Sequence, residues 1–236
     1  MNRYKLTAIL SLIALLAVSF AVFKSPDDRF ISYITEAKNI QFFYKSQNGQ
    51  NFGSIQNLKT SIESQKKKLL FATNGGMYKK DRSPQGLFIQ DGKIVTRIDT
   101  ATASGNFYLK PNGVFFISGN NEAQIQTTAN FHFSNKIKFA TQSGPMLVIN
   151  GEIHPEFKKG STNLNIRNGV GILPNVEVIF AISKKEVNFY DFAEYFKDLG
   201  CKNALYLDGF VSRMYVPEKN WVQTDGDFGV IIGVVE

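Results

Sequence analysis

The sequence contains one cysteine and two histidines, and these low numbers argue against several kinds of site. The lone thiol, Cys201, cannot form an intramolecular disulfide, so core burial must stabilise the fold without crosslinks. We expect Cys201 to fill apolar space at a helix–strand junction. Neither His132 nor His154 has a partner at metal-ligand spacing, which argues against a zinc site. The sequence therefore predicts no resident metal. A divalent cation bound at a carboxylate is left open, but no spacing of residues indicates one.

Other signatures of common functional classes are missing as well. The chain has no G-x-S-x-G nucleophile motif, no phosphate-binding P-loop and no dinucleotide fingerprint. Its net charge is +7, or +5 without Arg3 and Lys5, and the densest basic cluster is only the triplet 66–68. This net positive charge favours anionic ligands. The sequence nevertheless lacks the dense row of basic residues that is typical of a nucleic-acid-binding protein. We expect no cofactor and no nucleic-acid partner, so any chemistry must use carboxylate, arginine, amide and backbone groups.

The first 23 residues differ in kind from the rest. Arg3 and Lys5 precede a run over residues 6–23 without any charge, and Ser19-Phe20-Ala21 offers a cleavage site. This pattern is typical of a cleaved secretory signal. The alternative is an uncleaved anchor, because the run approaches the length that spans a bilayer. Both alternatives predict an exported domain, periplasmic or extracellular, which touches the membrane only through residues 6–23 if these are retained.

The remaining chain has the length of one domain. We expect residues 24–39 to be a linker and residues 40–236 to form the domain. Apolar residues at helical spacing predict helices over 54–66 and from Asn188, a plausible N-cap, to Gly200. Many short apolar segments separated by turns predict hairpins. Together these patterns predict an α+β fold, a single strand-rich domain with a mixed sheet and about two main helices.

Two apolar segments end in polar turns. Residues 204–207 run into Asp208 and a glycine, and residues 69–73 run into Asn74, Gly75 and Gly76. Reactive groups often lie at such strand ends. We predict that Asn74 and Asp208 meet across one cleft. The two glycine amides could form an anion nest.

Guanidinium groups near the predicted cleft add a binding function. Arg167 and Arg213 are natural bidentate partners of phosphate or carboxylate. Each signal is weak by itself, because Asp208 could simply pair with either arginine. Five motifs nevertheless follow one another along the chain: Asn74-Gly75-Gly76-Met77-Tyr78, Pro84-Gln85-Gly86-Leu87, Gln142-Ser143-Gly144-Pro145-Met146-Leu147, Arg167-Asn168-Gly169-Val170-Gly171, and residues 203–209 followed by Ser212.

In this order the motifs resemble the phosphodiester glycosidase family, the bacterial domain family related to the lysosomal uncovering enzyme. The resemblance covers roughly residues 40 to 236. One departure concerns Phe210-Val211-Ser212-Arg213, where the animal branch continues with further glycines and serines. At these positions, bulky side chains and the guanidinium of Arg213 take the place of small residues whose backbone amides could approach a phosphate. The resemblance therefore carries the fold and the location of the site, but not the identity of the substrate.

The resemblance implies a hydrolase that cleaves the bond between the anomeric carbon of a sugar and a phosphodiester oxygen. Asp208 would face the anomeric carbon as nucleophile, as base or as an orienting group, Asn74 would hold a sugar hydroxyl, and Arg167 would hold the phosphate. The implied substrate-binding residues are Gly75, Gly76, Gln85, Ser143, Gly144, Asn168, Ser212 and Arg213. The partner would be a sugar-phosphate or anionic glycan substrate. The alternative is a non-catalytic envelope protein that binds anionic or phosphate-containing glycans.

Overall fold

The computed structural model describes residues 27–208 and 211–236, so the expected export segment lies outside the described residues. The described chain forms three sheets and two α-helices, and each strand pair in the sheets is antiparallel. The predicted strand-rich α+β class with two main helices is confirmed. The expected hairpins are present, but the expected mixed sheet is wrong, because all strand pairs in the described sheets are antiparallel.

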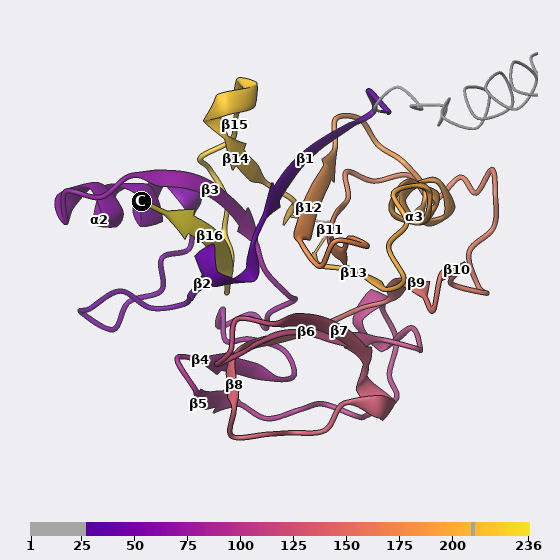
Figure 1. The fold of residues 1–236 in the computed structure, drawn as a ribbon, viewed down its shortest axis with the longest axis horizontal. Helices are drawn as coiled ribbons and strands as arrows, with labels where there is room; N and C mark the ends of the chain where they lie inside the picture. Colours follow the sequence, from indigo (N-terminus) through magenta and orange to yellow (C-terminus); the bar gives the residue numbers. More distant parts are fainter. Residues whose placement is uncertain (1–26, 209–210) are drawn as a thin grey trace, which may run out of the picture.

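The first sheet has the strand order β1-β12-β11-β13-β9-β10. Its strands are β1 (Phe30–Thr35), β12 (Val178–Ser183), β11 (Asn168–Ile172), β13 (Ala204–Tyr206), β9 (Met146–Ile149) and β10 (Glu152–Ile153). Helix α3 (Phe189–Asp198) packs on this sheet through Phe192 and Phe196, which are fully buried. Figure 1 shows α3 beside β9 and β10 on the right of the molecule.

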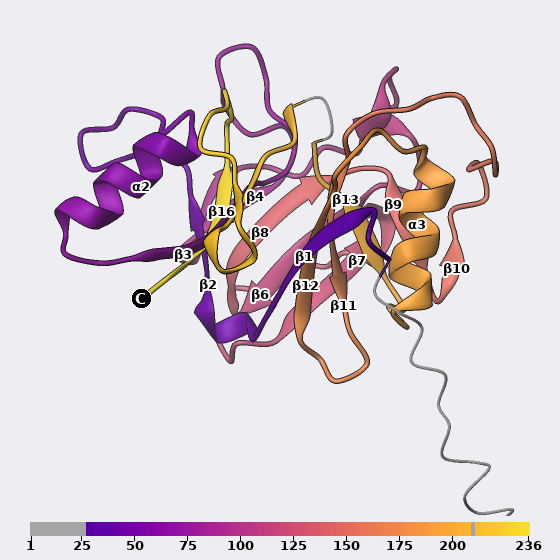
Figure 2. The same cartoon turned by 90° about the horizontal axis from the view of Figure 1, so that it is seen from above.

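The second sheet has the order β15-β14-β3-β16-β2. Its strands are β15 (Trp221–Val222), β14 (Met214–Val216), β3 (Leu69–Asn74), β16 (Ile231–Val235) and β2 (Ile40–Phe43). Helix α2 (Ile55–Ser64) covers its outer face through Ile55, Leu58 and Ile62. The two helices therefore lie at opposite ends of the molecule (Figure 2).

The third sheet has the order β5-β4-β8-β6-β7. Its strands are β5 (Lys93–Thr96), β4 (Phe88–Gln90), β8 (Ile137–Ser143), β6 (Gly113–Ser118) and β7 (Ala123–Thr127). The main core lies between the three sheets, where Phe71, Phe115 and Phe180 come from one sheet each. The Phe71 and Phe180 ring centroids are 5.0 Å apart, and those of Phe115 and Phe180 are 6.0 Å apart. Such ring pairs stabilise a core beyond the area that they bury.

Both predicted helices are confirmed, and each begins at a capping side chain. The Ser54 hydroxyl accepts from the Asn57 amide over 3.1 Å, and the Asn188 side chain accepts from the Asp191 amide over 2.8 Å. These bonds satisfy backbone donors that the first turn leaves open. Gly200 follows α3 with a φ of 81°, which a glycine adopts without strain. In the part of the chain that the structure describes, neither helix has the length and hydrophobicity needed to cross a membrane.

The middle of the predicted linker, which spans residues 24–39, is the strand β1. β1 pairs with β12 over six residues, from Phe30 opposite Ser183 to Thr35 opposite Val178. Its aromatic and β-branched residues favour a strand. The polar residues just before it dominate the composition of the region, which is why the sequence suggested a linker. The folded unit therefore begins about ten residues earlier than predicted.

Candidate functional site

Asn168, at the start of β11, joins the first and second sheets. Its side-chain amide donates to the Thr73 hydroxyl and to the Asn74 side-chain oxygen, both over 3.0 Å. Its own side-chain oxygen accepts from the Asp208 amide over 3.2 Å and from the Ser212 hydroxyl over 3.0 Å. Asn168 is fully buried, so each of these bonds replaces water that the group has lost. One side chain thus positions four neighbours.

Asn74 completes this buried network from the end of β3. Its Nδ2 donates to the backbone oxygen of Asp208 over 3.0 Å, and its Oδ1 accepts from the amide of Arg213 over 3.0 Å. The side chain is 1% exposed. The structure therefore gives Asn74 a positioning function, whereas the resemblance implied contact with a sugar hydroxyl.

The backbone of Asp208 is held from both sides. Its amide donates to Asn168, and its carbonyl oxygen accepts from Asn74 and, over 3.1 Å, from the Ser212 hydroxyl. Asp208 is half-buried at the tip of the chain that leaves β13. Fixed backbone and partial exposure are what a reacting carboxylate needs, because it must be oriented and also accessible.

The predicted glycine nest is only partly available. The Gly75 amide donates to the Val230 carbonyl over 2.8 Å, so it is not free for an anion. Gly76 lies against β8, and a Cβ there would come within 2.4 Å of the Gln142 carbonyl oxygen. Gly76 is therefore required for close packing of β3 on the third sheet. Ser143 is also structural, since its buried hydroxyl donates to the Leu207 carbonyl over 2.7 Å.

Gly144 and Gln85 lie at the same end of the third sheet, since Gly144 follows β8 and Gln85 precedes β4, its antiparallel neighbour. A Cβ on Gly144 would meet the Asn112 side chain at 2.6 Å, so no side chain fits there. Gln85 is half-buried, and its side-chain amide donates to the Tyr108 hydroxyl over 3.2 Å. Of these two, only Gln85 offers a side chain that a ligand could reach.

Arg213 is the predicted guanidinium that the structure brings to the cluster. Its amide bonds Asn74, and its side chain is 35% exposed. Nε donates to the Asp225 carboxylate over 2.8 Å, and another guanidinium nitrogen donates to the Ser212 carbonyl over 2.9 Å. The bond with Asp225 raises the pKa of Arg213 and holds the pKa of Asp225 below its usual value. Both groups are therefore charged at neutral pH.

Tyr78 and Arg82 belong to the same region, although the sequence analysis gave them no function. The Tyr78 hydroxyl donates to the backbone oxygen of Asp227, and the Arg82 guanidinium pairs with the Asp227 carboxylate. Burial raises the pKa of Tyr78, and the negative charges of Asp208 and Asp227 raise it further. The charge of Asp208 thus acts directly on the Tyr78 hydroxyl. The five-residue motif that begins at Asn74 was the only signal for Tyr78.

Arg167, the predicted phosphate ligand, lies elsewhere. It is fully buried, and its guanidinium stacks 3.6 Å from the centroid of the Phe189 ring. Its nitrogens donate to the carbonyls of Val187 and Asn163, each over 2.8 Å, and to the Tyr206 hydroxyl over 3.3 Å. Burial lowers its pKa. Arg167 therefore joins β11, β13 and α3 inside the protein, because alternation along the strand sends its side chain to the face opposite Asn168.

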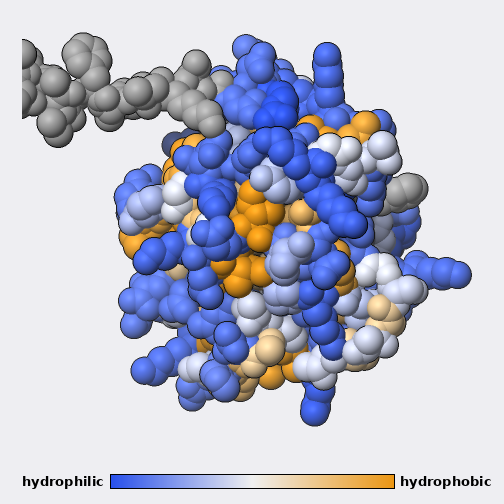
Figure 3. Space-filling view, turned by 90° about the vertical axis from the view of Figure 1, so that its right-hand side faces the viewer, coloured by the Kyte–Doolittle hydropathy of each residue, from blue (hydrophilic) through white to orange (hydrophobic). Residues whose placement is uncertain are grey.

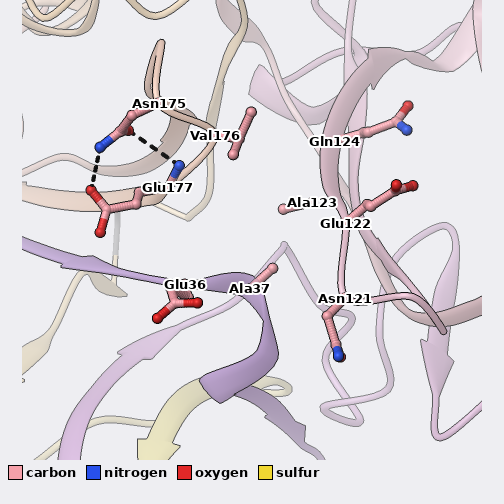
Figure 4. Close-up of a pocket in the computed structure, with 9 residues that line it drawn as sticks. All are labelled: Glu36, Ala37, Asn121, Glu122, Ala123, Gln124, Asn175, Val176 and Glu177. Carbon is pink, nitrogen blue, oxygen red and sulfur yellow. Dashed lines mark hydrogen bonds between the residues drawn. The ribbon is translucent and has the colours of Figure 1, made fainter.

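Two sizeable cavities lie away from this cluster. One of about 820 Å³ opens between η1 (Ala37–Asn39), the start of β7 and the turn after β11 (Figure 4). Glu36, Glu122 and Glu177 line it, and Asn175 bonds Glu177 over 2.5 Å. Three carboxylates would repel a phosphate. The turn lies at the end of β11 opposite Asn168, so this cavity is separate from the candidate site.

The described residues contain no group of three or more histidine, cysteine, aspartate or glutamate side chains placed to hold a metal ion. Cys201 is 1% exposed and packs against Gly171, as expected of an apolar filler.

The face with α3 and β10 is mainly hydrophilic, with hydrophobic areas at its centre and along its lower part (Figure 3). The candidate site is thus the Asp208 region, bordered by Tyr78, Arg82 and Arg213.

Comparison with known families gives one match by sequence. A family model described as phosphodiester glycosidase matches residues 67–233, a range that contains the whole cluster around Asp208. The uncharacterized protein YigE of Escherichia coli (strain K12) is 37% identical over 182 residues, which cover 77% of this chain and 71% of YigE.

Solved structures share the fold at low identity. The catalytic domain of zebrafish N-acetylglucosamine-1-phosphodiester alpha-N-acetylglucosaminidase, auto-inhibited by its pro-peptide, superimposes with a TM-score of 0.58 and 16% identity, covering 89% of this chain and 84% of that domain. A Burkholderia pseudomallei K96243 protein thought to be exported gives a TM-score of 0.57 and 10% identity, covering 87% and 73% of the two chains. At these identities the likeness concerns the fold alone.

Proposed function

The chain belongs to the phosphodiester glycosidase family, and on this basis we propose that it is an exported hydrolase of sugar-1-phosphodiesters. Water would attack the anomeric carbon, and the bond between that carbon and the phosphodiester oxygen would break. Its electron pair stays on the leaving phosphate monoester, so the products are a free sugar and that monoester. The observation that carries this proposal is the position of Asp208, half-buried at a strand end and fixed by both asparagines.

Asp208 would act on the sugar side of the scissile bond. A phosphate monoester is a good leaving group, so this reaction needs less general-acid catalysis than the hydrolysis of an ordinary glycoside. Stabilisation of the positive charge that develops at the anomeric carbon matters more. We place the Asp208 carboxylate beside the anomeric carbon, where it accepts the proton of the attacking water. Tyr78 keeps its proton at neutral pH, since its pKa lies above the already high value of an ordinary tyrosine. Its hydroxyl, which donates to the backbone oxygen of Asp227 in this structure, would turn to donate to a substrate oxygen instead.

Arg213 and Arg82 would neutralise the phosphate. Both guanidinium groups are partly exposed, and each pairs with a carboxylate of the 225–227 loop. A substrate phosphate would take the place of those carboxylates, since arginine binds phosphate and carboxylate with the same bidentate geometry. This replaces Arg167 as the phosphate ligand. Asn74, Asn168 and Ser212 then orient the groups that touch the substrate.

The test uses the purified protein with a panel of sugar-1-phosphodiesters and measures the release of reducing sugar with and without a chelator. We expect release from at least one substrate, no effect of the chelator, and loss of release in Asp208→Asn with an unchanged circular dichroism spectrum. Binding without release, unaffected by Asp208→Asn, would contradict the proposal and support an envelope protein that binds anionic glycans. Release that Asp208→Asn leaves unchanged would contradict the assignment of Asp208.

A further inference from the structure

Three polar side chains are joined by hydrogen bonds beside the candidate site. The Gln85 side-chain amide donates to the Tyr108 hydroxyl over 3.2 Å, and the Tyr108 hydroxyl donates to the Asp99 carboxylate over 3.0 Å. All three residues are half-buried. We call Gln85, Tyr108 and Asp99 the hydrogen-bond chain. The function proposed above gives none of them a role.

The direction of these hydrogen bonds is fixed from the Asp99 end. An ionised carboxylate can only accept, so the proton of the Tyr108 hydroxyl lies between Tyr108 and Asp99. The hydroxyl oxygen must then accept from Gln85, which turns the amide nitrogen of Gln85 toward it. The side-chain oxygen of Gln85 therefore points away from Tyr108. The amide has one orientation, although its two ends are nearly equal in shape.

Asp99 itself is held at its backbone and at its carboxylate. Its amide donates to the Gln142 side-chain oxygen over 2.9 Å, and its carbonyl accepts from the Gln142 side-chain nitrogen over 2.6 Å. Gln142 is fully buried. Asp99 Oδ1 accepts from the Ala101 amide over 2.9 Å, and Asp99 Oδ2 faces Tyr108. Each carboxylate oxygen thus has a fixed donor.

The Gln85 end of the hydrogen-bond chain lies close to Asp208. The backbone amide of Gln85 donates to the Met77 carbonyl over 2.9 Å. The Met77 side chain packs against the core cluster that contains Tyr206, two positions before Asp208. Two contacts therefore connect Gln85 to the end of β13.

The Tyr108 end reaches the same region through the 3₁₀-helix η2 (Asn106–Tyr108). A Cβ on Gly144 would come within 2.9 Å of a carbonyl oxygen of η2, so the two segments lie directly against each other. Ser143, which precedes Gly144, donates its hydroxyl to the carbonyl of Leu207 over 2.7 Å. Leu207 immediately precedes Asp208, so both ends of the hydrogen-bond chain are tied to the candidate site.

The side-chain oxygen of Gln85 is the free end of the hydrogen-bond chain. In the part of the chain that the structure describes, this oxygen accepts no hydrogen bond and is not one of the buried side-chain atoms without a partner. It is therefore open to solvent. A carbonyl oxygen accepts from a hydroxyl and repels another acceptor. With its orientation fixed, it can distinguish ligands that carry a donor from those that do not.

We propose that Gln85 determines specificity, because its side-chain oxygen accepts a hydrogen bond from a hydroxyl group of the substrate's sugar. Asp99 and Tyr108 are positioning residues that keep this oxygen turned toward the sugar. The proposal rests on the proposed function, which supplies the sugar-1-phosphodiester. The phosphodiester group offers only acceptor oxygens, so the sugar faces Gln85. The substrate class is thereby narrowed to sugars with a hydroxyl at this position.

The test uses the full chain and the diester that it hydrolyses fastest in the panel described above. In separate analogues, each hydroxyl of the sugar is replaced by hydrogen, the deoxy analogue, or by a methoxy group, the methylated analogue. At one position of the sugar, both replacements should lower kcat/KM of the wild type about tenfold, because neither analogue has a donor for the Gln85 oxygen.

Asp99→Asn should reverse the direction of the hydrogen bonds. The Ala101 amide still requires an acceptor, so the new amide nitrogen takes the place of Oδ2 and donates to Tyr108. Tyr108 then donates to the Gln85 oxygen, and the Gln85 nitrogen turns to the sugar. The methylated analogue still offers an acceptor oxygen and the deoxy analogue does not. The ratio of their kcat/KM values should therefore rise about tenfold over the wild-type ratio.

Two further variants complete the comparison. Tyr108→Phe removes the hydroxyl and lets the Gln85 amide take either orientation, so its ratio should be intermediate. Asp91→Asn, on an exposed turn, is the matched control for Asp99→Asn and should keep the wild-type ratio. The ratio separates positioning from a structural role, because a damaged fold lowers the hydrolysis of both analogues alike.

Two results would overturn this inference and leave the proposed function standing. One is wild-type hydrolysis that no deoxy or methylated analogue slows, and the other is a ratio that Asp99→Asn leaves unchanged. If the wild type hydrolyses no diester, the proposed function fails, and calorimetry then compares the same analogues of the diester that binds most tightly. The expected ratios of Kd are those given for kcat/KM. No binding, or binding that the analogues do not change, would overturn this inference as well.

Discussion

The side-chain amide of Asn74 donates a hydrogen bond to the backbone oxygen of Asp208 over 3.0 Å, although 134 positions separate the two residues in the chain. Asn74 ends β3 in the second sheet, and Asp208 follows β13 in the first. The bond thus joins two sheets at the point where each presents a polar strand end. It confirms the prediction that these two tips meet.

The first prediction concerns Asn168, which bonds Thr73, Asn74, Asp208 and Ser212. Asn168→Ala should lower the free energy of unfolding by about 3 kcal/mol, because several buried polar groups lose their partners. It should also lower hydrolysis strongly, since Asp208 loses its orientation. Urea unfolding measures the first effect. Asn130→Ala, at an exposed position, is the control. If Asn168→Ala lowers the free energy of unfolding as little as the control does, the hydrogen bonds of Asn168 do not stabilise the fold as described.

The second prediction separates the two arginines that the sequence could not distinguish. Arg213→Met should fold normally and lose about 100-fold in kcat/KM, the usual effect of removing one charged partner of a phosphate. Arg167→Met should instead lower the free energy of unfolding by about 3 kcal/mol, because the carbonyls of Val187 and Asn163 lose their donor. Thermal unfolding and steady-state kinetics, measured on both variants, show which arginine contacts the phosphate and which stabilises the fold. Reversed effects would restore Arg167 as the phosphate ligand.

These two arginines also show the limit of the sequence. Pattern and spacing predicted both helices, the strand-rich class and the meeting of Asn74 with Asp208. They could not predict on which face of β11 a side chain lies, because Arg167 and Asn168 are neighbours and register decides between them. The polar composition before Phe30 likewise concealed β1, whose strand depends on pairing with β12.

The third prediction concerns Asp225, which holds Arg213 over 2.8 Å. A substrate phosphate must replace this carboxylate, so Asp225→Asn should lower KM for anionic substrates several-fold and change kcat little. The gain is modest because the pair is partly exposed. Asp91→Asn, on an exposed turn, is the control. A higher KM in Asp225→Asn would mean that this carboxylate helps binding instead.

A pH titration of stability tests the same ion pair independently. The pKa of Asp225 is lowered in the folded protein by its bond with Arg213. The pair therefore stabilises the fold above the ordinary aspartate pKa, and this contribution is lost as the pH falls through the lowered value. Wild type should be slightly more stable than Asp225→Asn at pH 7, and the difference should vanish in acid. A difference that grows in acid would contradict this account.

The fourth prediction concerns the thiol of Cys201, whose pKa burial raises to about 12. Only the thiolate reacts with common thiol reagents. At pH 8 the native protein should react far more slowly than Asn135→Cys, whose new thiol is exposed, and 6 M urea should abolish the difference. Because the folded pKa is raised, alkaline pH between the unfolded and folded values should favour unfolding. Fast native labelling would contradict the burial of Cys201.

The most direct test of the central claim is hydrolysis in ¹⁸O-labelled water, with mass spectrometry of both products. Attack at the anomeric carbon, which we predict for the wild type, places ¹⁸O in the released sugar and none in the phosphate monoester. Asp208→Asn should form neither product at a comparable rate while keeping its fold. Incorporation of ¹⁸O into the phosphate monoester would mean cleavage of the phosphorus–oxygen bond and would contradict the proposed glycosidase function.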